Sequence, residues 1–421
     1  MESPAGLKGM LRAFRSRNYR LYFGGQGVSL IGTWMQAIAM SWLVYRLTGS
    51  ALLLGVVGFA SQIPVLILAP FAGVLADRWN RHRMIVVTQT LAMIQAFILA
   101  LLVLTGRVEV WHILTLSLFL GIVTAFDAPV RHAFVVQMVE KREDLSNAIA
   151  LNSAMFNGAR LVGPSVAGIL LAIVGEGVCF LLNGISFLAV IAALLAMSIP
   201  PPKLESRTGS MVRGVAEGFS YAYGFVPIRA ILLLVSCVSL VAMPYTVLMP
   251  VFASEVLHGG PESLGFLMGA SGCGALIGAV FLASRKSVFG LWEVIGLAAT
   301  LFGIGLIAFS LSRVFWLSLL LLMLAGFGMM VQMASSNTLL QTIVEDDKRG
   351  RVMSLYTMAF MGIAPFGSLL AGGLAHSLGA PLTLLIGGVA CIGAALVFAS
   401  QLPMLREMVH PIYVKMGLLS E

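Results

Sequence analysis

The sequence has 421 residues, of which 59% are hydrophobic and only 10% are Asp, Glu, Lys or Arg. Soluble domains carry about 25% charged residues, so this composition excludes a water-soluble globular protein. The formal net charge of +8 is spread over many short polar segments, which disfavours nucleic-acid binding. The four cysteines show neither metal-binding nor disulfide spacing, and we expect no metal and no cofactor.

Twelve apolar stretches are each long enough to cross a bilayer, which takes about 20 residues. Their continuous hydrophobicity favours helices over the alternating strands of a barrel. The sequence therefore predicts an all-α membrane protein with twelve transmembrane helices. The predicted spans are 21–46, 51–76, 83–104, 111–138, 146–174, 177–198, 227–257, 262–284, 290–311, 314–342, 352–376 and 380–402.

The basic residues are distributed unevenly between the two sides of these spans. Twenty of the 26 Lys and Arg lie on the side that includes residue 1, whereas the opposite side holds Arg46, Arg107 and Arg313. Cytoplasmic loops are enriched in Lys and Arg. Both termini are therefore predicted to be cytoplasmic.

The chain divides into two similar halves. Gly326 follows Gly121, and Gly373 follows Gly168, at a constant offset of 205 residues, while Gly265 follows Gly55 at an offset of 210. This indicates a duplication and predicts two six-helix, pseudo-symmetric halves. The predicted parts are an amphipathic amino-terminal segment at 1–20, six-helix bundles at 21–198 and 227–402, a central loop with an amphipathic helix at 199–226, and a cytoplasmic tail at 403–421.

A compact charged segment separates the second and third spans. It reads Gly73-Val-Leu-Ala-Asp77-Arg78-Trp-Asn-Arg81-His-Arg83 and resembles the signature loop of the major facilitator superfamily. The resemblance implies the two-bundle fold of these transporters and a cytoplasmic gate motif at these positions. In that family the acid lies near the amino terminus of the eleventh span, where the helix dipole favours an anion.

The fourth span carries Asp127 and Arg131, one helical turn apart. The sequence around them resembles the enterobactin-exporter and macrolide-efflux branch of the superfamily. Charges inside a span are costly and mark functional sites. Asp127, Arg131 and Arg160 of span five are therefore the predicted intramembrane charge network, in which Arg160 either pairs with Asp127 or binds an anionic cargo group.

Two further predictions concern the helices around this network. Gly163 and Pro164 of span five form a helix-kink motif that resembles part of the antiporter motif of superfamily exporters. Polar residues on a helix that is otherwise apolar favour the lining of an aqueous cavity, although each one alone is also explained by an interhelical hydrogen bond. The predicted cavity-lining residues are Gln26, Ser29, Thr33, Gln36, Gln62, Asn157, Asn183, Gln332 and Asn337.

The resemblance implies a secondary active transporter, an exporter of small amphipathic molecules by alternating access, coupled to protons as an antiporter. Its substrate would be a siderophore, a drug or a lysolipid, and it would act as a monomer in the lipid bilayer of a bacterial cytoplasmic (inner) membrane. The alternatives are a lysophospholipid flippase and a non-transporting membrane sensor or scaffold. An enzyme is not expected, since no nucleophile–base or paired-carboxylate arrangement emerges.

Overall fold

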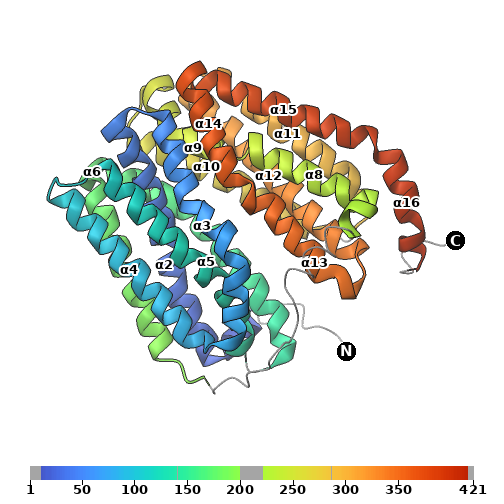
Figure 1. The fold of residues 1–421 in the computed structure, drawn as a ribbon, viewed down its shortest axis with the longest axis horizontal. Helices are drawn as coiled ribbons and strands as arrows, with labels where there is room; N and C mark the ends of the chain where they lie inside the picture. The colour runs from blue at the N-terminus through green and yellow to red at the C-terminus, as the bar shows by residue number, and fades with distance from the viewer. Residues whose placement is uncertain (1–10, 140, 200–220, 286, 416–421) are drawn as a thin grey trace. The chain divides into compact units, whose positions relative to one another are not determined.

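The computed structural model describes residues 11–139, 141–199, 221–285 and 287–415, and within them the side chains of 69–70, 72–78, 142, 346–347 and 415 are excepted. The regular structure of the described residues is helical (Figure 1). Eleven helical stretches are long and apolar enough to cross a membrane. One of them, α6 (Leu145–Leu195), has 51 residues and is interrupted by non-helical backbone at Gly175. Because one crossing takes about 20 residues, the described helices provide the twelve predicted spans.

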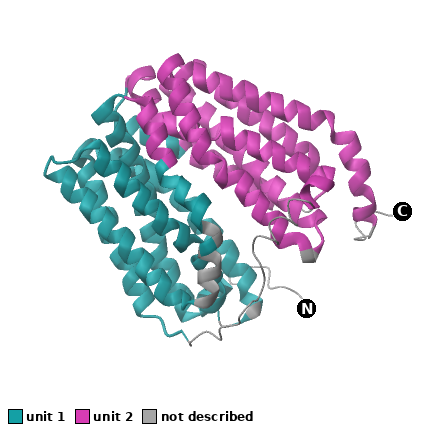
Figure 2. Cartoon of the chain, viewed as in Figure 1, with its two compact units in different colours: residues 1–49, 60–207, 259–269 teal, residues 50–59, 208–258, 270–421 magenta. Residues whose placement is uncertain are grey.

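The chain forms two compact units, residues 1–49, 60–207 and 259–269 in unit 1 and residues 50–59, 208–258 and 270–421 in unit 2 (Figure 2). Unit 1 is organised by the packing of α2 (Arg17–Thr48) along α6. Its core contains the fully buried side chains of Tyr22, Ile85 and Phe134. The other elements of this unit are η1 (Arg12–Arg15), most of α3 (Ala51–Arg78), α4 (Arg81–Leu104), α5 (Val110–Met138) and η2 (Arg142–Asp144).

Unit 2 is organised by α11 (Leu291–Leu311), which packs against α12 (Phe315–Ile343) and α15 (Ala380–Ser400). Phe302 and Phe309 of α11 are fully buried in this core. The other elements are α8 (Val226–Val241), α9 (Tyr245–Val251), the π-helix η3 (Phe252–Val256), most of α10 (Pro261–Ala283), α13 (Asp346–Thr357), the π-helix η4 (Met358–Gly362), α14 (Ala364–Leu378) and α16 (Leu402–Lys415).

The two units repeat the same close helix contact, which supports the duplication inferred from the sequence. In unit 1, an ideal Cβ atom on Gly121 of α5 would lie 2.5 Å from the backbone oxygen of Ser61 in α3. In unit 2, a Cβ atom on Gly326 of α12 would collide with the backbone oxygen of Ser271 in α10. Gly326 follows Gly121 by 205 residues and Ser271 follows Ser61 by 210. Both crossings therefore depend on glycine at equivalent positions.

The seventh predicted span, 227–257, is a crossing whose helix is interrupted in the structure. The structure ends α8 at Val241 and begins α9 at Tyr245. Pro244 has no N–H to donate, so the carbonyl of Leu240 loses its helical partner. Gly367 of α14 backs onto that carbonyl, because its ideal Cβ atom would lie 2.6 Å from the oxygen. Gly367 thus packs closely over the unpaired carbonyl of Leu240. Close contacts between a Cα–H group and a carbonyl oxygen are common at helix–helix interfaces.

The predicted carboxyl-terminal tail contains an ordered amphipathic helix, α16. Leu405, Val409 and Tyr413, four residues apart, are buried, and the ring of Tyr413 lies 5.5 Å from that of Phe289. Arg406 forms an ion pair with Glu293 at the start of α11. This helix is therefore a docked part of unit 2. The amphipathic helix predicted within the central loop at 199–226 is not tested, because residues 200–220 lie outside the described residues.

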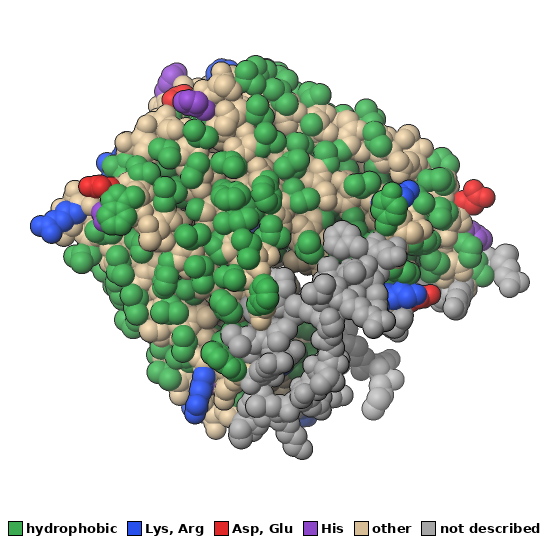
Figure 3. Space-filling model, viewed as in Figure 1, with side chains coloured by type: hydrophobic (Ala, Val, Ile, Leu, Met, Phe, Trp, Pro, Cys, Tyr) green, Lys and Arg blue, Asp and Glu red, His purple; other side chains and the backbone are tan. Residues whose placement is uncertain are grey.

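Apolar side chains cover most of the molecular face in Figure 3, and the charged side chains visible there lie near its margins. Large apolar side chains are exposed on many of the described spans, among them Ile67, Leu101, Leu297 and Leu320. Water does not solvate such a surface well. The described helices therefore form a multi-pass membrane protein.

A partly buried ion pair, with Glu176 buried and Arg46 half-exposed, joins α2 to the turn within α6. Glu176 is 8% exposed and follows Gly175. Its two carboxylate oxygens accept hydrogen bonds from Nε of Arg46 at 2.6 Å and from Nη2 at 3.3 Å. The sequence analysis did not single out Glu176. An acid directly after a glycine, between two apolar stretches, is the sequence feature by which Glu176 could have been identified.

We expect Glu176→Gln to lower the free energy of unfolding by about 1 kcal/mol, because hydrogen bonds to charged groups contribute about this much and Arg46 is half-exposed. Thermal unfolding of the detergent-solubilised protein measures the effect. Glu143→Gln is the matched control, since the pair that Glu143 forms with Lys141 is exposed. Exchanging the partners, Arg46→Glu with Glu176→Arg, should restore part of the loss. Equal stability of all these variants would show that the pair contributes nothing.

Candidate functional site

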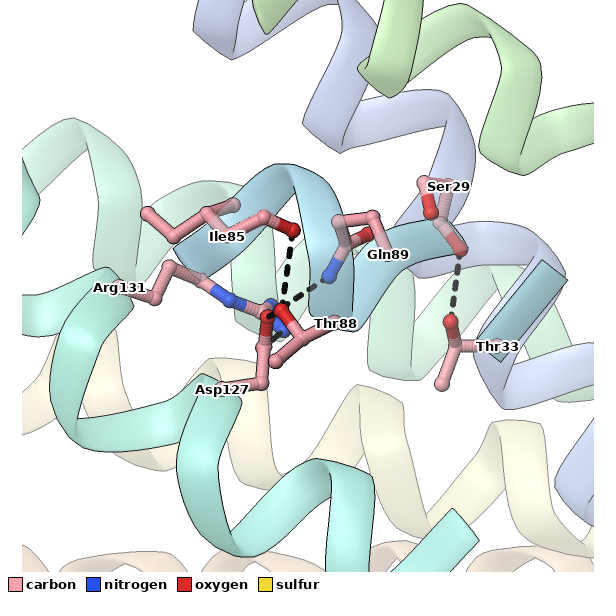
Figure 4. A network of polar contacts seen from close by, with 7 residues as sticks. All are labelled: Ser29, Thr33, Ile85, Thr88, Gln89, Asp127 and Arg131. Carbon is pink, nitrogen blue, oxygen red and sulfur yellow. Dashed lines mark hydrogen bonds and ion pairs between the residues drawn. The ribbon is translucent and has the colours of Figure 1, made fainter. Parts of the chain in front are cut away.

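The candidate site in unit 1 centres on Asp127, which is 3% exposed on α5. One carboxylate oxygen accepts hydrogen bonds from the Thr88 hydroxyl at 2.7 Å and from the Gln89 amide at 2.9 Å, both on α4. The other oxygen is ion-paired with Arg131, one turn along α5 (Figure 4). The structure thus brings Asp127 and Arg131 together as predicted by their spacing. It adds Thr88 and Gln89, which the sequence analysis did not identify.

A polar face of α2 lies in the same bundle. Gln26 and Ser29 are at most 2% exposed, and Oε1 of Gln26 and Oγ of Ser29 have no hydrogen-bond partner among the described residues. The same is true of the fully buried Tyr22 hydroxyl. Buried polar groups of this kind are normally satisfied by ordered water. Figure 4 shows Ser29 and Gln89 in the same region as Asp127.

The equivalent place in unit 2 carries no charge. Gln332 and Ser336 of α12 follow Asp127 and Arg131 by 205 residues. Nε2 of Gln332 donates to Oγ of Ser336 at 3.3 Å, again one turn along the helix. The duplicated scaffold therefore has an ion pair in one copy and a neutral hydrogen bond in the other.

Arg160 lies elsewhere in unit 1, on α6. Its guanidinium carbon is 5.9 Å from the centre of the Trp34 ring on α2. Gly163 permits this approach, because its ideal Cβ atom would lie 2.5 Å from Cβ of Trp34. The backbone at Gly163 and Pro164 is helical, and the non-helical residue within α6 is Gly175. The ion pair described for Asp127 is with Arg131.

The gate motif is described only in part. The side chains of Gly73, Asp77 and Arg78 lie outside the described residues. Arg81 and Arg83 lie in the first turn of α4. Oδ1 of Asn80 accepts a hydrogen bond from the backbone N–H of Arg83 at 3.2 Å, so Asn80 caps this helix. The φ angle of Asn80 is −68°, so its backbone is extended.

Two predicted cavity-lining residues, Gln36 and Asn183, form a buried chain of amides with Gln95 in unit 1. Asn183 of α6 donates to Gln36 of α2 at 2.7 Å, and Gln36 donates to Gln95 of α4 at 2.9 Å. All three are at most 5% exposed. Gln332 is also buried, whereas Thr33 is exposed and Gln62, Asn157 and Asn337 are intermediate. The lining of a cavity remains a prediction for this set.

We expect Gln36→Leu to destabilise the protein by about 1–2 kcal/mol, because it leaves one buried donor on Asn183 and one buried acceptor on Gln95 without Gln36. Thermal unfolding measures this loss. Thr33→Val is the control on the same helix, since Thr33 is exposed and its hydroxyl donates to the backbone carbonyl of Ser29 in the preceding turn. The double variant Gln36→Leu with Asn183→Leu should cost less than the sum of the single changes. Additive losses would argue against a coupled network.

Side-chain hydrogen bonds to backbone groups join the ends of α2, α4 and α6 in unit 1, and the sequence analysis did not foresee them. The Asn18 amide donates to the carbonyl of Ser198 at 3.0 Å and accepts from its N–H at 3.3 Å. The Tyr19 hydroxyl donates to the carbonyl of Ala148 at 2.9 Å. Nε2 of His82 lies 2.8 Å from the carbonyl of Leu194. These contacts stabilise the end of the bundle at which the gate motif begins α4.

Comparison with known proteins agrees with this architecture. Residues 9–412 match the family described as "Transmembrane secretion effector". The chain is 24% identical to the staphyloferrin A transporter of Staphylococcus aureus, over 90% of this chain and 95% of that one. It is 24% identical to macrolide efflux protein A of Streptococcus pyogenes, over 93% and 97% of the two chains. It is also 26% identical to the multidrug efflux pump Tap of Mycobacterium tuberculosis, over 91% of each chain.

Solved structures share the fold at low sequence identity. A bacterial homologue of the human lysosomal transporter Spinster aligns with a TM-score of 0.71 and 14% identity, covering 94% of this chain and 98% of that one. A POT family transporter aligns with a TM-score of 0.74 and 12% identity, covering 92% and 96%. At these identities the likeness concerns the fold alone.

Proposed function

The chain belongs to the transmembrane secretion effector family of major facilitator transporters, and on this premise we propose that it is a secondary active exporter of small amphipathic molecules. The observation that carries the proposal is similarity over nine-tenths of the chain to proteins named as a siderophore transporter, a macrolide efflux protein and a multidrug efflux pump. Transport would proceed by alternating access, which fits the two-unit, twelve-span scaffold.

Proton coupling is the proposed energy source, and Asp127 is its proposed site. Asp127 is a deeply buried acid in a span, where ionisable groups are expensive and functional. The unpartnered polar atoms of Tyr22, Gln26 and Ser29 support access of water to this region. Protonation of Asp127 would weaken its ion pair with Arg131 and so change the packing of α4 against α5.

The membrane location and orientation of the protein are proposed from its charge distribution. The excess of Lys and Arg on one side supports cytoplasmic termini and a bacterial inner membrane location. The gate motif, with Asp77 and Arg81, would then lie at the cytoplasmic surface, and the sequence-derived boundaries at 21–198 and 227–402 would be the transport bundles. One chain carries both halves, which supports a functional monomer.

Efflux in a bacterial strain that lacks its own exporters tests the proposal. Cells expressing the protein are loaded with radiolabelled staphyloferrin A or a radiolabelled macrolide, and retention is followed with time. Faster loss of either compound than in vector-only cells supports export, and retention of both contradicts it for these compounds. In inverted vesicles, Asp127→Asn should abolish accumulation driven by an imposed pH gradient. Accumulation that persists in this variant would overturn the assignment of the proton site.

A further inference from the structure

One face of α2 carries three buried polar side chains. Tyr22, Gln26 and Ser29 are spaced by four and three residues, so they share this face. Each is at most 2% exposed. The Tyr22 hydroxyl, Oε1 of Gln26 and Oγ of Ser29 form no hydrogen bond with any described residue. A buried polar atom without a partner costs free energy, so this face requires a polar occupant.

This face of α2 lies at the depth of the acid in α5. Oγ of Ser16, directly before α2, donates to the carbonyl of Met138, the last residue of α5, at 2.5 Å. The two helices pack against each other. Counted from this contact, Ser29 is thirteen residues along α2 and Asp127 is eleven residues back along α5. At 1.5 Å per residue these distances are about 20 and about 17 Å, so the two side chains lie at a similar depth.

Two more buried polar atoms lie between this face and the acid. The Tyr22 hydroxyl interacts electrostatically with Arg131, and Nε of Arg131 has no hydrogen-bond partner in the described part of the chain. On α4, Nε2 of Gln89 donates to Asp127 at 2.9 Å, while Oε1 at the other end of the same amide is buried and unpartnered among the described side chains. In the view of Figure 4, Gln89 lies between Asp127 and Ser29. We name as the internal polar site the residues that carry these five atoms, Tyr22, Gln26, Ser29, Gln89 and Arg131.

The chemistry of the five atoms fits water. The hydroxyls of Tyr22 and Ser29 and Nε of Arg131 offer donors, whereas Oε1 of Gln26 and of Gln89 are acceptors. A metal cation would be repelled by the guanidinium, and an anion would be repelled by the neighbouring carboxylate. Water both donates and accepts, and a buried water typically forms about three hydrogen bonds with otherwise unsatisfied groups. Ordered water is therefore the occupant that satisfies this set.

Unit 2 contains an equivalent arrangement. Ser239 of α8 follows Ser29 by 210 residues, and Gln332 of α12 follows Asp127 by 205. Helix α8 packs against α12 as α2 packs against α5. Oγ of Ser239 and Oε1 of Gln332 belong to fully buried residues and have no hydrogen-bond partner among the described residues. The buried polar site is therefore duplicated, and the copy in unit 1 adjoins an acid, whereas the copy in unit 2 adjoins an amide.

We propose that the internal polar site holds ordered water that relays the proton of Asp127 along α2, toward the end at which Ser16 meets Met138. Gln26 and Ser29 act as positioning residues, because they fix the waters by hydrogen bonds and exchange no proton themselves. The proposal rests on the proposed proton coupling and adds the route and the residues that form it. That end of α2 is the one proposed to be cytoplasmic.

The proton transfer balances within the site. The O–H bond of protonated Asp127 breaks, a water takes the proton, and the carboxylate re-forms its ion pair with Arg131. Each following water accepts one proton and gives up another, so the chain of waters is unchanged. The guanidinium disfavours a cation that remains in the site, so the proton is passed on. The titratable side chains described on the helices around Asp127 are Arg131 and His132 of α5 and Tyr22 of α2, with Arg160 of α6 at the Trp34 ring.

Hydrogen–deuterium exchange at the Asp127 carboxyl tests the relay. Infrared difference spectroscopy of the full-length protein in nanodiscs at low pH records the C=O stretch of protonated Asp127, which is identified by its absence in Asp127→Asn. Transfer to heavy water shifts this band at the rate of proton exchange. We expect Gln26→Leu and Ser29→Ala each to slow the shift by about tenfold, because each removes a hydrogen bond to the water chain. Ser239→Ala, the matched change in unit 2, should leave the rate as in the wild type.

Thermal unfolding establishes whether the site contains water. Tyr22→Phe removes the hydroxyl and keeps the ring. If this hydroxyl binds water, its removal should lower the Tm, whereas in a dry site the loss of an unsatisfied hydroxyl should raise it. Tyr223→Phe is the control, since the Tyr223 side chain is exposed and the change should leave the Tm unaltered. Should Gln26→Leu or Ser29→Ala not fold, Tyr22→Phe also serves in the exchange measurement, where it should slow the band shift.

The outcomes separate this inference from the proposed function. Exchange that is as fast in Gln26→Leu and Ser29→Ala as in the wild type overturns the relay, and a raised Tm of Tyr22→Phe overturns the bound water. Either result leaves Asp127 as the proton site to the vesicle measurement. If no protonated band appears as the pH falls, both the proton site and the relay are wrong, and efflux alone decides export. Slower exchange in the variants, with accumulation that persists in Asp127→Asn, supports the relay and contradicts coupling through Asp127.

Discussion

Asp127→Ala is expected to lower the free energy of unfolding by about 3 kcal/mol, because it leaves the guanidinium of Arg131 without its ion-pair partner inside the bundle. Thr88 and Gln89 lose their shared acceptor in the same change. Thermal and denaturant unfolding of the detergent-solubilised variant measure the loss. Among substitutions of single polar side chains, we expect this effect to be the largest.

The double variant Asp127→Ala with Arg131→Leu separates the ion pair from the hydrogen bonds. Removing both charges eliminates the uncompensated cation, so the double variant should be more stable than Asp127→Ala alone. Losses that simply add would mean that the two side chains do not interact. Gln332→Ala is a useful comparison, because the equivalent hydrogen bond to Ser336 is neutral and its loss should cost about 1 kcal/mol.

A single added methyl group at Gly121 should destabilise unit 1 by about 1–3 kcal/mol, the usual range for overpacking. Its Cβ atom would lie 2.5 Å from the backbone oxygen of Ser61, and a backbone atom has no rotamer by which to move away. Gly24→Ala is the matched control, because Gly24 is helical and nothing lies within 4 Å of its ideal Cβ atom. There, alanine should stabilise the helix by up to about 1 kcal/mol.

The duplication makes the same prediction for unit 2. Gly326→Ala should lose a similar amount, since its Cβ atom meets the backbone of Ser271. Thermal unfolding of the three variants gives the comparison. If Gly121→Ala and Gly326→Ala were as stable as Gly24→Ala, the helix crossings would be looser than the structure has them.

Hydrophobicity and chain length were sufficient to predict the spans. The structure has α12 at Phe315–Ile343 where 314–342 was predicted, and α5 at Val110–Met138 where 111–138 was predicted. The break at Pro244 was missed, because the sequence around it is uniformly apolar. In addition, the carbonyl that the break leaves unpaired packs against Gly367, which is distant in sequence. Helix α16 was missed for a similar reason: its stability comes from docking on α11.

The candidate site was less accessible to sequence reasoning. A spacing of four residues correctly placed Asp127 beside Arg131, because that pair is local to one helix. The polar residues of α2 were ambiguous between the lining of a cavity and interhelical hydrogen bonds, since Gln36 and Thr33 both interrupt an apolar helix. Gln36 bonds to neighbouring helices, whereas Thr33 is exposed. Periodicity identifies a polar residue but does not say which neighbouring helix faces it.

The two halves agree where helices cross and differ where the interior is polar. Gly121 and Gly326 occupy equivalent crossings, whereas the ion pair of Asp127 and Arg131 in unit 1 corresponds to the neutral pair of Gln332 and Ser336 in unit 2. Packing therefore constrains both copies of the duplicated scaffold in the same way, while the charge at the equivalent position has diverged. Any response of this position to protonation would then be confined to one half of the chain, and the two halves would respond asymmetrically.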